Sequence, residues 1–296
     1  MRLPVVVGVD GSESSLRALD WAAAEAARSR LPLRIVHASL WEHYEGLRPP
    51  VDPAHPVEQV LAERLVDSAR NRVRGLRPEV EVEADVQPED PVAALVRESH
   101  EAAAIVLGSR GRGRIAGMLL GSVGLALAGR SHCPVVVIPA RPPRATAEPG
   151  RVVVGIGDAA EPAPAAFFAL TRAASRHGEL IAVRAWRGPA HALLNRQPLP
   201  GSPEPTHRRK AEEHLEAVLA ALTAQDGSGT LVHRTVTQGP THQVLIEAAE
   251  GAELLVVGAR RSSGWHGLQL GPVDHAVLHY APCPVAVVPD TYAHRS

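Results

Sequence analysis

Three segments in the first half of this 296-residue sequence return in its second half, and this duplication constrains the fold more than any other feature. The pairs, at offsets of 147, 150 and 150 residues, are 5–9 (VVVGV) with 152–156 (VVVGI), 106–110 (VLGSR) with 256–260 (VVGAR), and 133–137 (CPVVV) with 283–287 (CPVAV). A period this long is that of a whole domain, because solenoid repeats are only about 20–50 residues long. The chain is therefore predicted to contain two domains with a common fold.

The joint between the copies is predicted at residues 141–150 (RPPRATAEPG), a proline-rich segment without an apolar period, as is typical of a linker. The predicted domains are then residues 1–140 and 151–296. Hydrophobic residues make up 45% of the sequence, which is enough for two separate cores.

Each copy alternates short β-branched runs with stretches of helical period. Strands are predicted at 5–9, 33–38, 80–86, 103–107 and 134–138, helices at 16–27, 57–76, 91–102 and 121–128, and second-copy strands near 152–156, 180–185, 231–236, 253–257 and 284–288. Because strands that alternate with helices form right-handed βαβ units, the predicted class is α/β, with an open, mostly parallel sheet covered by helices on both faces in each domain. Asp90 is predicted to cap the helix that Pro91 opens.

Charge and cysteine content exclude other classes of protein. Lys and Arg number 31 against 32 Asp and Glu, a net charge of -1, which argues against a broad nucleic-acid or anionic-membrane surface. No uncharged apolar run reaches the ~18–20 residues of a membrane span, and the first residues lack the pattern of a signal peptide. Cys133 and Cys283 are too few for a disulfide framework and are expected to be small buried side chains. These features predict a soluble, cytoplasmic protein.

Two segments of the first copy lie where an open parallel sheet binds ligands, beyond the carboxyl ends of its strands. Asp10 follows the first predicted strand, and a glycine-rich loop at 108–114 (GSRGRGR) follows the fourth and leads to Gly121 and Ser122. Glycines let backbone N–H groups approach phosphate oxygens, and a helix N-terminus presents unpaired N–H groups. Ser122 could cap that helix or contact phosphate, and Asp10 could bind ribose hydroxyls or a metal ion. The alternative is a plain tight turn.

Two common nucleotide motifs are excluded. The loop is not a Walker A loop, because the only lysine of the chain is Lys210. It is not the dinucleotide fingerprint either, because residues 10–15 (DGSESS) after the first strand do not match it.

The spacing of Gly108, Gly111, Gly121 and Ser122 reproduces the G-x2-G-x9-G-[S/T] pattern of the universal stress protein family. With the Asp10 turn, the Cys-Pro-Val strand and the duplication, nearly the whole chain resembles a tandem universal stress protein. The resemblance implies two five-stranded parallel sheets of order 3-2-1-4-5. It also implies ATP, with or without Mg²⁺, bound by the loops after strands one and four.

Carried over by position, the resemblance implies a role for nine residues of the first copy. Asp10 would contact ribose or metal, and Ala38 would lie against adenine. The residues flanking ribose and base would be Leu107, Gly108 and Arg110, and those enclosing the phosphates would be Gly111, Gly121, Ser122 and Val123. Arg110, Arg112, Arg114 and Arg130 surround the glycine-rich loop in sequence and are expected to neutralise a triphosphate, with a solvated basic face as the alternative.

The second copy departs from the pattern. Arg261 replaces the second glycine, and Pro272, which has neither hydroxyl nor backbone N–H, replaces the serine. Gly157 stands where the first copy has Asp10, although Asp158 could substitute after a shift of one residue. Arg260 and Arg261 could still attract an anion. The sequence predicts one ATP per chain, bound in the first copy.

Other chemistry is less strongly indicated. His275 and His279 have the spacing that places two imidazoles on one helix face, but surface histidines fit better than a metal site.

The favoured function is a nucleotide-dependent stress-response regulator that hydrolyses ATP slowly at most, with no catalytic residue assigned. An ATP-using enzyme on the same fold is the alternative. The closing strands are expected to pair edge to edge as an intramolecular pseudo-dimer, which could dimerise further, and the protein partner is unknown.

Overall fold

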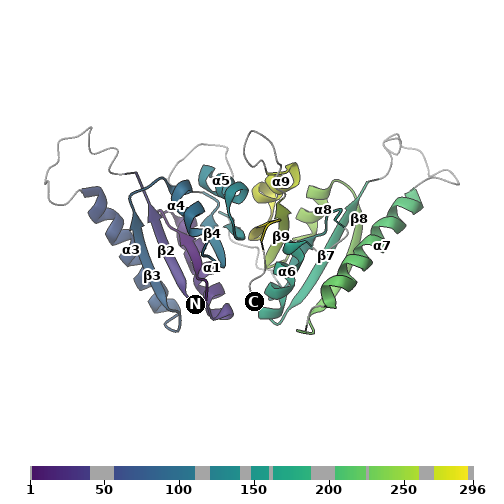
Figure 1. Cartoon of the computed structure of the whole chain (residues 1–296), viewed down its shortest axis with the longest axis horizontal. Coiled ribbons are helices and arrows are strands. Elements are labelled where there is room, and N and C mark those ends of the chain that lie inside the picture. The colour runs from purple at the N-terminus through teal and green to yellow at the C-terminus, as the bar shows by residue number, and fades with distance from the viewer. Residues whose placement is uncertain are drawn as a thin grey trace. The chain divides into compact units, whose positions relative to one another are not determined.

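The computed structural model describes residues 2–40, 57–110, 121–140, 148–159, 163–187, 204–224, 227–259 and 270–292. These residues divide into two compact units, one up to Ala140 and the other from Glu148 (Figure 1). Residues 141–147 of the predicted linker lie outside the described residues. No helix in the described ranges is long and apolar enough to cross a membrane.

The first unit is an α/β sandwich around a five-stranded parallel sheet. Its elements are β1 (Val5–Gly8), α1 (Glu13–Ser29), β2 (Leu33–Ala38), α3 (Val57–Leu76), β3 (Val82–Gln87), α4 (Pro91–Glu98), β4 (Ala104–Gly108), α5 (Ser122–Arg130) and β5 (Val135–Ile138). The strand order is β3-β2-β1-β4-β5, with every pair parallel. This is the order 3-2-1-4-5 that the resemblance implies.

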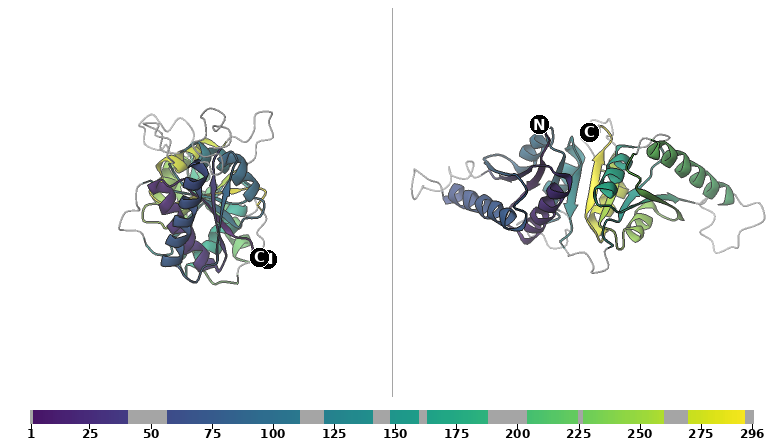
Figure 2. Two further views of the ribbon diagram at one scale, coloured as in Figure 1. Left: turned by 90° about the vertical axis from the view of Figure 1, so that its left-hand side faces the viewer. Right: turned by 90° about the horizontal axis from the view of Figure 1, so that it is seen from below.

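Helices cover both faces of this sheet (Figure 2). Helices α1 and α3 contact each other and pack on β1, β4, β2 and β3, while α4 and α5 contact each other and pack on β2 and β5. The central strands are therefore buried on both faces, which explains why β1 and β4 are continuous apolar runs rather than alternating ones.

The second unit repeats the arrangement. Its elements are β6 (Val152–Gly155), α6 (Pro164–Ser175), β7 (Glu179–Trp186), α7 (Glu204–Thr223), β8 (Leu231–Gln238), α8 (Thr241–Ala248), β9 (Leu254–Ala259), α9 (Pro272–Tyr280) and β10 (Val285–Pro289). The parallel order is β8-β7-β6-β9-β10. Even the turn after the first helix matches, because Arg30 (φ 52°) and His177 (φ 50°) both adopt the left-handed conformation.

Helix boundaries differ from the sequence prediction where capping decides them. Helix α1 begins at Glu13, three residues before the predicted start, because the Ser12 hydroxyl accepts a hydrogen bond from Ser15 N at 3.2 Å. The predicted cap of α4 is confirmed, since Asp90 Oδ1 accepts from the N–H groups of Val92 and Ala93, both at 3.0 Å. Local side-chain acceptors thus set both helix starts.

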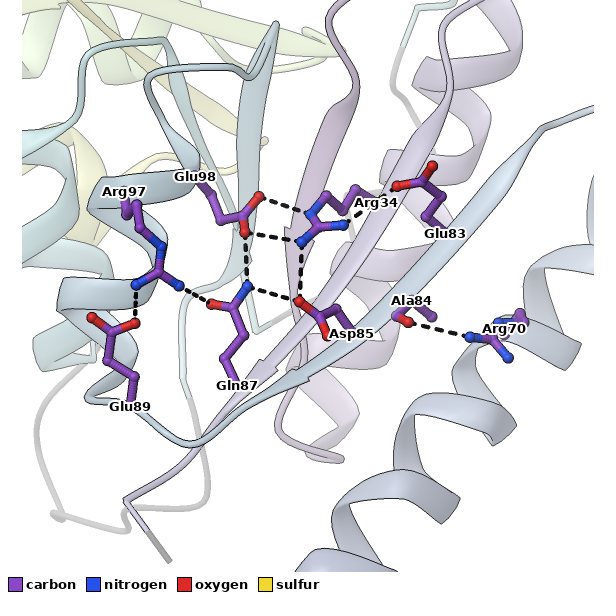
Figure 3. A network of polar contacts seen from close by, with 9 residues as sticks. All are labelled: Arg34, Arg70, Glu83, Ala84, Asp85, Gln87, Glu89, Arg97 and Glu98. Atoms are coloured by element: carbon purple, nitrogen blue, oxygen red, sulfur yellow. Dashed lines mark hydrogen bonds and ion pairs between the residues drawn. The ribbon is translucent and has the colours of Figure 1, made fainter. Parts of the chain in front are cut away.

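A polar network joins β2, β3 and α4 in the first unit (Figure 3). The Arg34 guanidinium donates to Glu98 at 2.8 Å and 3.2 Å and to Asp85 at 3.0 Å, and it also pairs with Glu83. Gln87 Nε2 donates to Glu98 Oε1 at 2.7 Å and to Asp85 Oδ2 at 3.0 Å. The hydrogen bond to Glu98 raises the pKa of Arg34. One guanidinium therefore holds three carboxylates against the sheet.

We expect Arg34→Ile to destabilise the first unit by about 1–3 kcal/mol, because the half-buried Glu98 and Asp85 lose their charged donor. The second unit has Ile181 and Ala248 at the equivalent positions. The double variant Arg34→Ile/Glu98→Ala should therefore recover part of the loss. Urea unfolding of the three chains measures both effects, and equal losses in the single and double variants would contradict this account.

Candidate functional site

The turn after β1 and the loop after β4 meet at one edge of the first unit. Strands β1 and β4 are parallel neighbours, with Val5 opposite Ala104 and Val7 opposite Val106, so their carboxyl ends lie side by side. The Ser12 hydroxyl donates to the Arg110 carbonyl oxygen at 3.4 Å. The two segments that the sequence singles out are therefore in contact.

Asp10 is positioned by the turn that it forms. Its Oδ1 accepts from Ser12 N at 2.9 Å, and its own N–H donates to the Ser15 hydroxyl at 3.3 Å. Gly11 between them has φ 78°, a conformation that favours glycine. The carboxylate is thereby fixed beside the first turn of α1, at the ligand-binding end of the sheet.

Gly108 is required by packing. A Cβ at this position would lie 2.6 Å from the Ser14 carbonyl carbon and 2.5 Å from its hydroxyl oxygen. The Ser14 hydroxyl also accepts from Arg110 N at 3.4 Å. The end of β4 therefore presses directly on the first turn of α1, and only glycine permits this approach.

The two ends of the loop after β4 lie close together. Gly121 N donates to the Ser109 carbonyl oxygen at 2.7 Å, and Ser109 N donates to the Ile138 carbonyl oxygen at 2.8 Å. The loop thus begins and ends at the carboxyl end of β4, although Gly111, Arg112 and Arg114 lie outside the described residues.

Helix α5 starts at this point without a side-chain cap. Gly121 is its N-cap residue, Ser122 is its first residue and Val123 its second, and no side chain makes a cap hydrogen bond among the described residues. The interpretation of Ser122 as a cap is therefore wrong, because the hydroxyl lies one position too late. Arg130 ends α5, about 12 Å along the axis from Ser122, so it lies far from the helix start that the predicted site includes.

The remaining predicted residues lie at the neighbouring strand ends. Ala38 ends β2 opposite Gln87 and is half-buried. Its neighbour His37 donates from Nδ1 to the Val9 carbonyl oxygen at 2.7 Å, which ties β2 to the Asp10 turn. The Leu107 side chain is only 6% exposed and faces Gly8, so it belongs to the core.

Sequence reasoning missed Ser109. This residue is 4% exposed, and its hydroxyl has no hydrogen-bond partner among the described residues. A buried polar atom without a partner costs about 1–3 kcal/mol, which is a reason to look for a ligand or water at this point. A comparison of the two copies would have pointed to this position, because the second copy has Ala259 where the first has Ser109.

The second unit builds the corresponding edge differently. Helix α6 starts at Pro164, one turn later than α1, and among the residues that the structure describes a Cβ on Gly258 would meet Ala165 Cβ at 3.4 Å and nothing closer. Arg184, the counterpart of His37, pairs with Asp158 at 2.6 Å and donates to the carbonyl oxygen of Gly157. Asp158 is therefore held by an arginine, unlike Asp10, which is held by backbone N–H. Arg260 and Arg261 lie outside the described residues.

The cysteines and the histidine pair have ordinary surroundings. Cys133 and Cys283 are free thiols, each 2% exposed, and burial raises the pKa of each to about 12. The His275 and His279 rings lie 4.5 Å apart, and burial together with His275 lowers the pKa of His279. Across the described ranges no three His, Cys, Asp or Glu residues form a cluster that could hold a metal ion.

Comparisons with known proteins agree with this architecture. The model of the universal stress protein family matches twice, over residues 1–139 and 149–289. A universal stress protein of Mycobacterium tuberculosis is 32% identical over 292 residues, covering 96% of each chain, and one of Mycobacterium bovis is 31% identical, covering 96% of this chain and 94% of the relative. A crystal structure of an Archaeoglobus fulgidus universal stress protein covers 97% of this chain and 98% of its own, with TM-score 0.65 and 18% identity. The chain belongs to the universal stress protein family, in its tandem form.

Proposed function

We propose that the first unit binds one ATP at the edge where the Asp10 turn meets the loop after β4, and that ATP occupancy regulates the protein in a stress response. The observation that carries this proposal is a pair of contacts at the end of β4. Gly121 N donates to the Ser109 carbonyl oxygen at 2.7 Å, and the Ser12 hydroxyl donates to the Arg110 carbonyl oxygen at 3.4 Å, so the uncapped start of α5 and the Asp10 turn both meet this strand end.

The residues present fit the chemistry of ATP. A triphosphate needs N–H donors, and the start of α5 at Ser122 and Val123 offers them without a competing side-chain cap. The buried Ser109 hydroxyl is a further donor without a partner among the described residues. The Asp10 carboxylate lies where it could accept from ribose hydroxyls or hold Mg²⁺. Ala38, Gly108, Arg110 and Gly111 complete the proposed site, and the buried Leu107 lies behind it in the core.

Regulation is favoured over catalysis. His37, the imidazole at this edge, is engaged with the Val9 carbonyl oxygen through Nδ1, and the sequence places no lysine in the loop. Phosphoryl transfer needs positioned charge on the transferring group, so the alternative of an ATP-using enzyme has less support. The proposal includes a cytoplasmic location and a protein partner. Pairing of the two closing strands within one chain, and a further homodimer, stay predictions.

Two measurements test the function directly. Nucleotide extracted from the protein as purified should be adenosine phosphate, and turnover of added ATP should stay far below about one per second, the lower end for typical enzymes. Purified protein that neither carries nor binds adenine nucleotide would contradict the proposal. Turnover above that rate would favour the enzyme.

Asp10→Ala should weaken ATP binding roughly 5- to 150-fold, the equivalent of about 1–3 kcal/mol for a lost charged hydrogen bond or metal contact. Asp10→Asn keeps an acceptor for Ser12 N and should lose less. Asp158→Ala in the second unit is the matched control and should leave the affinity unchanged. Calorimetric titration with Mg²⁺ present measures all three. An unchanged affinity in Asp10→Ala would show that Asp10 only forms the turn.

A further inference from the structure

Asp274 lies in the first turn of α9, at the place where the first unit is proposed to receive phosphate. Asp274 is only 7% exposed, and its Oδ2 accepts a hydrogen bond from Gly271 N at 3.3 Å. Gly271 is the N-cap residue of α9 and Pro272 its first residue. A buried carboxylate of the chain itself therefore lies at the start of this helix, where it accepts from the N–H of the N-cap residue. The counterpart of that N–H in the first unit, Gly121 N, donates to the Ser109 carbonyl oxygen, so what Asp274 adds at this place is negative charge.

The first unit has no side chain at the equivalent position. Helices α5 and α9 begin with GSVG (121–124) and GPVD (271–274), so Gly124 corresponds to Asp274. Gly124 leaves the start of α5 open, whereas Asp274 adds a buried negative charge to the start of α9. A second anion close to that carboxylate would meet like-charge repulsion, and burial strengthens this repulsion because the local dielectric is lower than that of water.

The opposite end of the same edge is also occupied by the chain's own groups. Arg184 donates to Asp158 Oδ1 at 2.6 Å and to the Ile156 carbonyl oxygen at 3.2 Å. His214 of α7 donates from Nε2 to the Gly157 carbonyl oxygen at 3.0 Å. These contacts are independent of Asp274. They engage the acid and the carbonyl groups that follow β6, where the first unit has Asp10.

We propose that the second unit excludes polyphosphate by its own charge, because the buried Asp274 carboxylate lies in the first turn of α9, where the first unit is proposed to bind phosphate. The Arg184–Asp158 pair engages the acid at the other end of the same edge. The inference rests on the proposed function only in taking the first unit as the reference for where phosphate binds. It makes Asp274 a specificity-determining residue that acts in addition to the donor missing at Pro272.

The test uses full-length protein, inorganic tripolyphosphate as the probe, and hydrogen exchange of the peptides that contain 271–281 and 121–131. In the wild-type chain, tripolyphosphate should leave peptide 271–281 unprotected. Both Asp274 variants are made on a Pro272→Ser background, because Pro272 itself removes a backbone donor. In Asp274→Gly, which restores the residue of the first unit, millimolar tripolyphosphate should protect that peptide, with an affinity at least about tenfold above that of Pro272→Ser alone. Asp274→Asn removes the charge but keeps the volume, and it should show smaller protection.

Two results would overturn the inference. One is protection of 271–281 in the wild type, which would mean that Asp274 excludes nothing. The other is equal, absent protection in wild type and both variants, which would leave Asp274 as a helix cap only. If Asp274→Gly fails to fold, Asp274→Asn decides between these outcomes. The peptide 121–131 reports on the first unit separately, so failure of ATP or tripolyphosphate binding there refutes the proposed function without affecting the result at α9.

Discussion

Titration of the full chain with ATP should give one site per chain, and Ser122→Pro should weaken that site by roughly two to four powers of ten. Proline removes both the Ser122 hydroxyl and its backbone N–H, and each lost charge-assisted hydrogen bond costs about 1.5–3 kcal/mol. Helix α5 should survive, because Ser122 is its first residue, where proline is tolerated. Helix α9, which begins with Pro272, shows that the same fold accepts this residue.

Controls separate the two contributions of Ser122. Ser122→Ala keeps the N–H and loses the hydroxyl, so it should fall between wild type and Ser122→Pro. Pro272→Ser in the second unit should not add a second site by itself, because Asp274 remains in place. Two equal sites in the wild type, or full affinity in Ser122→Pro, would show that the phosphates bind elsewhere.

Asp274→Asn should stabilise the second unit by about 1–3 kcal/mol at pH 7.5 and by much less at pH 4. Burial raises the pKa of Asp274 from 3.8 to about 6, partly offset by the hydrogen bond from Gly271 N. The folded state therefore binds the proton more tightly than the unfolded state. Stability falls as pH rises from about 4 to about 6, and the full cost of the charge is present above that window.

Two further terms affect the size of this effect. The helix dipole favours a carboxylate in the first turn by about 0.3–1 kcal/mol. This is less than the cost of burying the Asp274 charge, which is roughly 3 kcal/mol for a rise in pKa from 3.8 to about 6. Asparagine keeps an oxygen that can accept from Gly271 N. Urea unfolding at several pH values, with hydrogen exchange of α9 to identify the unit, measures the difference. A gain that grows toward pH 4 would contradict the burial argument.

Much of the fold could be predicted because it depends on local pattern. The duplication, the order of elements and the Asp90 cap follow from residues that are close in sequence. The late start of α6 was harder to predict, since it depends on the absence of a capping residue such as Ser12.

The candidate site was predictable in outline and not in its contacts. Asp10 is indicated by its place after the first strand, and Gly121 by the spacing of the glycine motif. The Arg184–Asp158 pair joins residues 26 apart, and their proximity depends on how β6 and β7 align. The burial of Asp274 is a property of packing, and so is the Ser109 hydroxyl that has no partner among the residues the structure describes. Comparison of the two copies position by position would have singled out both residues, because their counterparts are Ala259 and Gly124.

The contact between Gly108 and Ser14 limits what the family motif can reveal about a sequence. The first glycine of that motif is needed for the strand end to reach α1, so its presence reports on packing before any nucleotide is involved. The second unit keeps Gly258, although among the described residues a Cβ there would meet Ala165 Cβ at an ordinary 3.4 Å, so the glycine is present even where the features proposed to bind phosphate are gone. Under the two proposals made here, the residue three places after the N-cap of the fourth helix distinguishes the copies better than this glycine does, since Gly124 and Asp274 differ there in charge as well as in size.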